Sequence, residues 1–178
     1  NVPAFVAHLD ATIEVPGLRS LKLDVAYGGV FFAIVDARAL GFSITPDEAR
    51  DLVTLGTRIV TAAADQLRVR HPKHPNIMAK LFAQFAGPTH HRKGRHVSKN
   101  TVVVPPGWLD RCPTGTGTSA RLALMHARRQ IRRGEILEHQ SILGSRFLGE
   151  VIEASKVGAL PAVRTAIRGR AWISGMQH

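Results

Sequence analysis

The sequence has little cysteine, few aromatic residues and no long apolar run, and each shortage excludes a class of protein. Cys112 is the single cysteine among 178 residues, so there is no internal disulfide and no zinc site made of several cysteines. A lone cysteine fits a reducing compartment, and we expect a cytoplasmic protein. The longest apolar run, residues 30–35, has the length of a buried strand and falls far short of the ~18 residues of a transmembrane helix. We therefore expect no association with membranes.

Acidic residues are also scarce, since 13 Asp and Glu stand against 24 Lys and Arg. Much of the basic excess lies in residues 90–96 and in Arg128, Arg129, Arg132 and Arg133. Such clusters can bind nucleic acid. However, no aromatic residue lies among these charges, which argues against stacking on single-stranded bases. The simpler interpretation is a solvated loop and a solvated helix face, so nucleic-acid binding is kept only as a remote alternative.

The pattern of apolar residues predicts an α+β domain, because strands run consecutively rather than alternating one for one with helices. The clearest helix spans residues 46–69. Thr45 is its expected N-cap, Pro46 its first residue, and Glu48 completes a capping box. Apolar residues then recur at helical spacing, so one face of this helix should lie on the core.

The remaining elements are shorter. A second helix is predicted over residues 119–131, with Gly134 ending it, and a polar basic loop over residues 87–98. The pair Gly28-Gly29 between two strands indicates a tight turn, a bulge or a close approach of backbone. Strands are predicted over residues 2–15, 21–25, 30–35, 77–86, 101–104, 141–147, 149–154, 162–167 and 171–174.

Residues 114–119, Thr-Gly-Thr-Gly-Thr-Ser, carry the clearest chemical signal. Glycines let backbone approach a ligand, and the first N–H groups of a following helix lack partners within it, which together make an anion site. The segment lacks the lysine of a phosphate-binding loop, so the expected anion is a carboxylate. Asp110, four residues earlier, suits a ligand that also carries an amine, such as an amino acid. Alternatively, Asp110 only orders the turn, for example by pairing with Arg111.

Residues 110–121 have the sequence DRCPTGTGTSAR, which resembles the second active-site motif of the proline racemase family. That family includes 4-hydroxyproline 2-epimerases and trans-3-hydroxy-L-proline dehydratases. The motif is specific, and the likeness covers the whole chain. Further matching segments are residues 1–6, 24–29, 32–37, 144–149 and 169–175.

The resemblance implies two similar α+β lobes of the diaminopimelate epimerase type, with the active site between them. Each lobe is a mixed or antiparallel sheet wrapped around a long central helix. Residues 1–178 correspond to the second lobe. The first lobe, with its Cys-Gly-His motif, and the final strands are absent from the sequence. We therefore expect a small-molecule substrate and a catalytic cysteine from the missing lobe. A homodimer is one candidate for the oligomeric state.

The resemblance also assigns roles to residues. Asp110 would bind the ring amine of the substrate, and the backbone N–H groups of Gly115 and Thr116 would hold its carboxylate. Thr114 stands where racemases and epimerases have their second catalytic cysteine. Epimerases also have a substrate-contacting histidine upstream, which residues 82–85 lack. The resemblance implies no metal and no organic cofactor.

Thr114 changes the expected reaction. Racemisation needs proton carriers on both faces of the α-carbon, and a thiol with a pKa of about 8.5 can serve, whereas a threonine hydroxyl is far too weak an acid. One base from the first lobe could still remove the α-proton and expel a neighbouring hydroxyl. The prediction is a hydro-lyase that converts trans-3-hydroxy-L-proline to Δ1-pyrroline-2-carboxylate. The alternative is a 4-hydroxyproline 2-epimerase or proline racemase, in which Cys112 could be a displaced catalytic thiol.

Overall fold

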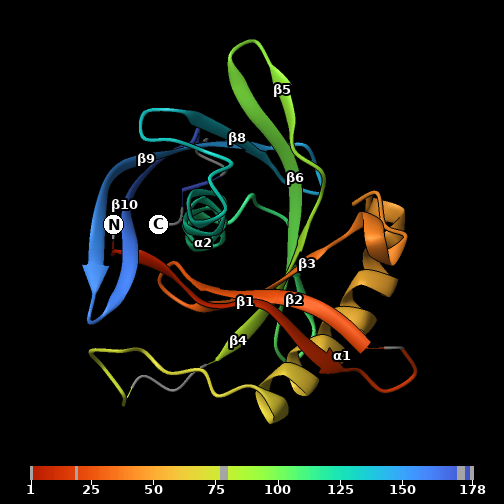
Figure 1. Ribbon diagram of the computed structural model, residues 1–178. Coiled ribbons are helices and arrows are strands. Elements are labelled where there is room, and N and C mark those ends of the chain that lie inside the picture. Colours follow the sequence, from red (N-terminus) through yellow and green to blue (C-terminus); the bar gives the residue numbers. More distant parts are fainter. Residues whose placement is uncertain (1, 19, 77–79, 172–174, 177–178) are drawn as a thin grey trace.

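The structure is a computed structural model that describes residues 2–18, 20–76, 80–171 and 175–176. One curled sheet of mixed direction encloses helix α2 (Gly115–Ala127), while the longer α1 (Ala49–Gln66) lies on its outside (Figure 1). This is the expected α+β lobe with a sheet wrapped around a central helix. The strands are β1 Ala4–Glu14, β2 Ser20–Tyr27, β3 Phe31–Asp36, β4 Leu81–Ala86, β5 His90–Arg92, β6 Arg95–Val104, β7 Trp108–Asp110, β8 Ile136–Gln140, β9 Arg146–Val157 and β10 Leu160–Arg168.

The strand order explains how the sheet surrounds α2. It runs β4-β3-β2-β1-β10-β9-β8-β6-β5, and β4 pairs with β6 as well, so the two ends of the path meet. The pairs β3–β4 and β6–β8 are parallel, and the other pairings among these strands are antiparallel. Closing a sheet in this way leaves an interior that side chains must fill, and α2 fills it.

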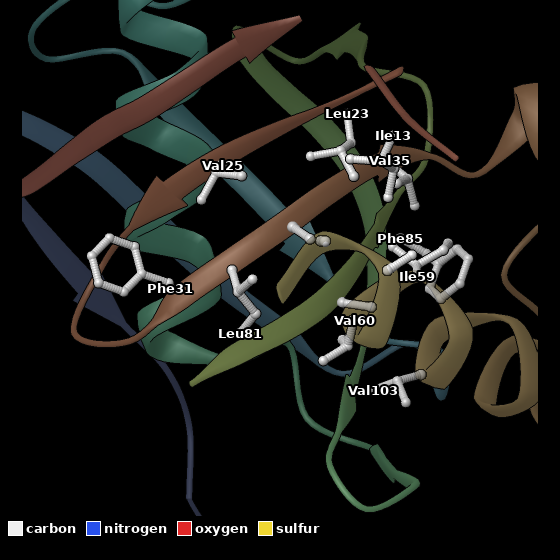
Figure 2. Packing of buried hydrophobic residues seen from close by; sticks show 14 of the residues in the cluster. Ile13, Leu23, Val25, Phe31, Val35, Ile59, Val60, Leu81, Phe85 and Val103 are labelled. Carbon is white, nitrogen blue, oxygen red and sulfur yellow. The ribbon is translucent and has the colours of Figure 1, made fainter. Parts of the chain in front are cut away.

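Strand β3 is buried on both faces, as its continuous apolar sequence predicted. Phe31, Ala33 and Val35 belong to the core cluster that includes α1, whereas Phe32 and Ile34 belong to the cluster that includes α2. Alternate residues of a strand point to opposite faces, so β3 separates the two helices. Figure 2 shows the outer cluster, in which β-strand side chains such as Val35 gather with Ile59 and Val60 of α1.

Helix α1 largely confirms the predicted helix over residues 46–69. It is preceded by a 3₁₀ turn, Pro46–Glu48, and the Glu48 carboxylate accepts the Thr45 backbone N–H at 2.9 Å. The helix ends at Gln66, three residues earlier than predicted, because Leu67 is already extended.

Helix α2 corrects the prediction over residues 119–131. It begins four residues earlier, at Gly115, and ends four residues earlier, at Ala127. Glycine and threonine are poor helix formers, so the sequence placed this first turn in a loop, but contacts with the surrounding sheet override that preference. Gly134 does not end the helix. The chain turns earlier, where Arg129 has a left-handed φ of 57°.

The predicted loop over residues 87–98 is also wrong, because β5 and β6 form a hairpin there. Its turn residues, Lys93 and Gly94, both have positive φ, of 49° and 72°. Such values match the primed turns that connect twisted strands. The hairpin projects from one end of the sheet (Figure 1).

The tail also differs from the prediction. Residues 141–147 are mostly a turn between β8 and β9, and strand β7 was not predicted. Residues 77–79 and 172–174, parts of two predicted strands, lie outside the described residues.

Candidate active site

The motif that carries the resemblance spans the end of β7, a short loop and the start of α2. Asp110 is the last residue of β7, and its Oδ1 accepts the backbone N–H of Cys112 at 2.9 Å. Asp110 therefore does order the turn, as the simpler interpretation held. It does so through Cys112 and not through Arg111, which forms no ion pair with another described residue.

Thr114, immediately before α2, has an unusual backbone. Its φ of 60° and ψ of 116° are rare for a β-branched residue and indicate local strain. The residue is 5% exposed, and its Oγ1 donates a hydrogen bond to the Pro113 carbonyl at 2.7 Å. The hydroxyl proton is thus engaged by backbone, and no histidine or carboxylate among the described residues accepts it.

The first turn of α2 has the arrangement expected of an anion site. Thr118 N–H donates to the Thr114 carbonyl at 3.0 Å, which is the first helical bond. The N–H groups of Gly115, Thr116 and Gly117 therefore have no acceptor within the helix. Gly117 is buried, whereas Gly115 is half-buried and Thr116 exposed, so the latter two can meet a ligand. Their predicted role in holding a carboxylate, like that of Asp110 and Thr114, stays a prediction.

Gly28 and Gly29 explain how β2 and β3 can approach this turn so closely. A Cβ on Gly28 would contact the Thr116 carbonyl oxygen and come within 2.6 Å of the Ala120 nitrogen. Gly29 has φ of 127°, and a Cβ there would lie 2.8 Å from Thr116 Cγ2. Both contacts are too close for an ordinary side chain, so the third interpretation, close approach of backbone, is correct.

A buried polar network supports the turn from within the sheet, and sequence analysis missed it. Gln84 on β4 and Asn100 on β6 are both fully buried, and the Gln84 side chain donates to Asn100 Oδ1 at 3.2 Å and to the Gly117 carbonyl at 3.3 Å. Asn100 Nδ2 donates to the Pro113 carbonyl at 3.2 Å, and its Oδ1 lies 3.5 Å from Thr114 Oγ1. Two amides thereby fix the residues on either side of the helix start. The available signal was a polar residue at an inward-facing position of an apolar strand.

His139 on β8 completes this support. Thr118 Oγ1 donates to the Thr114 carbonyl at 2.7 Å and lies 2.8 Å from His139 Nδ1. Since the hydroxyl proton goes to Thr114, Nδ1 is the donor to Thr118 and the imidazole is neutral. Burial lowers the pKa of His139 to about 3, with a smaller effect from the charge of Arg121.

Cys112 lies beside Thr114 but faces differently. Its Sγ accepts the Thr114 backbone N–H at 3.2 Å, and the residue as a whole is exposed. Partial burial of the sulfur raises the pKa of the thiol, and Asp110 raises it further. Cys112 and Pro113 line a cavity of about 670 Å³ together with Arg95, Phe147, Arg168 and Arg170. The thiol therefore lies next to the helix start with its pKa raised above the ordinary value.

The described residues lack both a cluster of metal ligands and a membrane-crossing helix. They contain no group of three or more potential metal ligands of the His, Cys, Asp and Glu types. None of their helices combines the length and apolar character needed to cross a bilayer.

The geometry defines a class of fold: an α+β lobe whose curled sheet encloses a helix that begins in a glycine-rich turn. Comparison with known families matches residues 1–178 to the family described as proline racemase. The chain belongs to the proline racemase family. The family and the fold predicted from the motif are confirmed.

Two solved structures resemble the chain closely. A hydroxyproline epimerase from Agrobacterium vitis, with bound trans-4-OH-L-proline, is 36% identical with a TM-score of 0.86, over 95% of this chain and 48% of that one. A probable proline racemase from Agrobacterium radiobacter K84, with bound carbonate, is 33% identical with a TM-score of 0.89, over 99% of this chain and 51% of that one. The chain thus spans about half the length of each. Neither is described as a dehydratase, so the closer likeness to dehydratases stays a prediction.

Proposed function

We propose that this chain is the second lobe of an enzyme that removes the α-proton of a proline-type amino acid. The start of α2 supports this, because the N–H groups of Gly115 and Thr116 suit a carboxylate. The same donors would stabilise the charge that develops on the carboxylate as the proton leaves. The ligands of the two similar structures, a hydroxyproline and carbonate, carry anionic groups of this kind.

The fate of the carbanion has two candidates. Likeness to an epimerase and a probable racemase favours returning a proton to the α-carbon. The residues of this lobe favour elimination, because Thr114 replaces the second catalytic cysteine expected from the family. Its Oγ1 donates to the Pro113 carbonyl at 2.7 Å, and within the described residues it forms no hydrogen bond to a base. This observation supports elimination, and we propose dehydration of trans-3-hydroxy-L-proline.

Stereochemistry explains why one proton carrier suffices for that substrate. In trans-3-hydroxy-L-proline the α-hydrogen and the 3-hydroxyl lie on the same face of the ring, opposite the carboxylate. A first-lobe thiolate on that face can take the α-proton and then protonate the departing hydroxide, so that water leaves and a C2–C3 double bond forms. The enamine then tautomerises to Δ1-pyrroline-2-carboxylate. Racemisation, in contrast, needs a second carrier on the face that Thr114 covers.

The direct test gives the full-length protein trans-3-hydroxy-L-proline and 4-hydroxy-L-proline separately in deuterated water. We expect a pyrroline product from the first and no inversion of the second. If NMR shows inverted, α-deuterated 4-hydroxyproline and no pyrroline, the dehydratase proposal is wrong and the epimerase alternative holds.

A pair of substitutions tests the role given to Thr114. Thr114→Cys restores a thiol and should introduce inversion of 4-hydroxyproline, whereas Thr114→Ser keeps a hydroxyl and should not. Equal inversion by both variants would show that position 114 does not set the reaction.

Cys112 is the specific feature that keeps the epimerase alternative open, because its thiol lies beside Thr114 and accepts the Thr114 backbone N–H at 3.2 Å. A second carrier at this position predicts that Cys112→Ser abolishes any inversion. Under the dehydratase proposal, Cys112→Ser leaves kcat within about twofold, since a hydroxyl can replace the thiol as acceptor of the Thr114 N–H.

Asp110→Asn tests recognition of the amine without disturbing the turn. The asparagine oxygen can still accept the Cys112 N–H, which Asp110 Oδ1 accepts at 2.9 Å, but the negative charge is lost. We expect kcat/KM to fall by an amount equivalent to about 1.5–3 kcal/mol, the usual value of a hydrogen bond to a charged group. An unchanged kcat/KM would limit Asp110 to ordering the loop.

A further inference from the structure

A second polar cavity, of about 630 Å³, lies along the later turns of α2 and is separate from the proposed active site. Its lining includes Arg121 and Arg128 from the helix side, and none of residues 110–116 contributes. The opposite walls come from β2, β3 and the segment before β5. The polar groups important below are Asp24, Asp36, Thr89, Arg121, Arg128 and Gln130.

Arg121 is the unusual member of this lining. Its Nε is shielded from solvent and has no hydrogen-bond partner among the described residues. Burial lowers the pKa of the guanidinium, and the charges of Asp24 and Asp36 raise it. Arginine stays protonated in proteins, so the cavity wall contains a largely buried cation. Removing such a charge from water without a paired anion is costly.

The two nearby carboxylates are already engaged by other donors. Asp24 accepts Arg128 Nη2 at 2.7 and 3.0 Å and also the backbone N–H of Asp10 at 2.9 Å. Asp36 Oδ1 accepts the backbone N–H of Arg38 at 2.9 Å. Neither forms an ion pair with Arg121 within the part of the chain that the structure describes. Arg121 is therefore held near negative charge, and no described residue forms an ion pair with it.

We propose that this cavity binds a small organic molecule through a carboxylate that pairs with Arg121. A planar guanidinium offers two parallel N–H donors to a carboxylate. A singly charged carboxylate fits better than a phosphate dianion, because Asp24 and Asp36 would repel the second charge. A volume of about 630 Å³ suits an organic ligand rather than a bare ion, and Thr89 and Gln130 can hydrogen-bond its remaining polar groups.

The test uses ¹⁵N-labelled full-length protein titrated with sodium acetate, with neutral acetamide and inorganic phosphate as comparison probes. The readouts are the Arg121 Nε–H signal and the backbone signals of Thr89 and Gln130. Signals of Gly115 and Thr116 report the proposed substrate site, so failure of one site is distinguishable from failure of the other. We expect acetate to shift the cavity signals to saturation with a dissociation constant on the order of 1 mM, and acetamide to leave them in place.

Two variants sharpen the result. Arg121→Lys keeps the charge but loses the paired donors, so acetate should bind about tenfold more weakly, a difference of about 1.4 kcal/mol. Arg128→Lys is the matched control, since Arg128 lines the same cavity but is already paired with Asp10 and Asp24. The acetate affinity of this variant should stay within about twofold of the wild-type affinity. If Arg121→Lys does not fold, the wild-type titration alone decides. Three results would overturn the proposal: cavity signals that do not change with acetate, that change equally with acetamide, or that change more strongly with phosphate.

Discussion

Helix α1 lies on the outside of the sheet, whereas α2 is enclosed by it, and their surroundings differ accordingly (Figure 1). The core around α1 is apolar, and Leu52 and Ile59 of this helix are fully buried in it. Figure 2 shows Ile59 beside Phe85 of the sheet. The start of α2 instead contacts buried polar groups, among them Gln84 and Asn100. We infer that contacts of α1 mainly stabilise the lobe, while those of α2 mainly position the donors of the site.

Substitution in the α1 core should give the largest change in stability. Leu52→Ala removes a side chain that is 0% exposed, and such truncations cost about 2–5 kcal/mol of unfolding free energy. Urea denaturation of the full-length protein measures this loss, and kcat of the molecules that remain folded should be unchanged. A kcat that falls together with stability would contradict the inference that α1 mainly stabilises the lobe and α2 mainly positions the donors.

Two glycine substitutions, one against the start of α2 and one on α1, test whether the two helices have different roles. Gly28→Ala forces a Cβ against the Thr116 carbonyl, so the helix start must move, and a shift of about 1 Å can lower kcat about 100-fold. Gly56→Ala is the matched control on α1, since its Cβ would lie 2.8 Å from the Val103 side chain. That change should lower stability by about 1–3 kcal/mol and leave kcat intact. Equal effects on kcat would contradict the comparison.

The buried histidine beside α2 should make stability depend on pH. Unfolded His139 takes up a proton near its ordinary pKa of 6.5, whereas in the folded protein its pKa is about 3. Its contribution is therefore complete above pH 6.5 and is lost as the pH falls toward 3, by about 1.4 kcal/mol per pH unit. His139→Asn keeps a donor for Thr118 but does not titrate. The stability advantage of the wild type over this variant should shrink as the pH falls, and parallel curves would disprove the assignment.

The smallest effect is expected at the first turn before α1. Glu48→Ala removes the acceptor of the Ser43 and Thr45 backbone N–H groups and should lower stability by about 0.3–1.5 kcal/mol. Asp47→Ala, which removes an acidic residue from the same turn, should cost less. Neither should change kcat or KM, and a change in KM would connect this turn to the substrate site.

The sequence was most informative where structure depends on neighbours in the chain. The cap at Thr45 and Glu48 and the apolar face of α1 follow helical spacing, so that helix was predicted to within three residues of its end. The motif at residues 110–121 likewise predicted the family and the helix start as an anion site. Local spacing contains this information because capping and helix dipoles act over one turn.

Tertiary structure alone decided the boundaries of α2 and the support of its first turn. The propensities of Gly115 and Gly117 favour a loop, and only burial inside the closed sheet makes them helical. Gln84, Asn100 and His139 come from three strands far apart in sequence, so no local pattern could bring them together. The sequence alone therefore predicted which residues would carry the chemistry. The closed sheet determined how these residues are held, because that depends on contacts between distant strands.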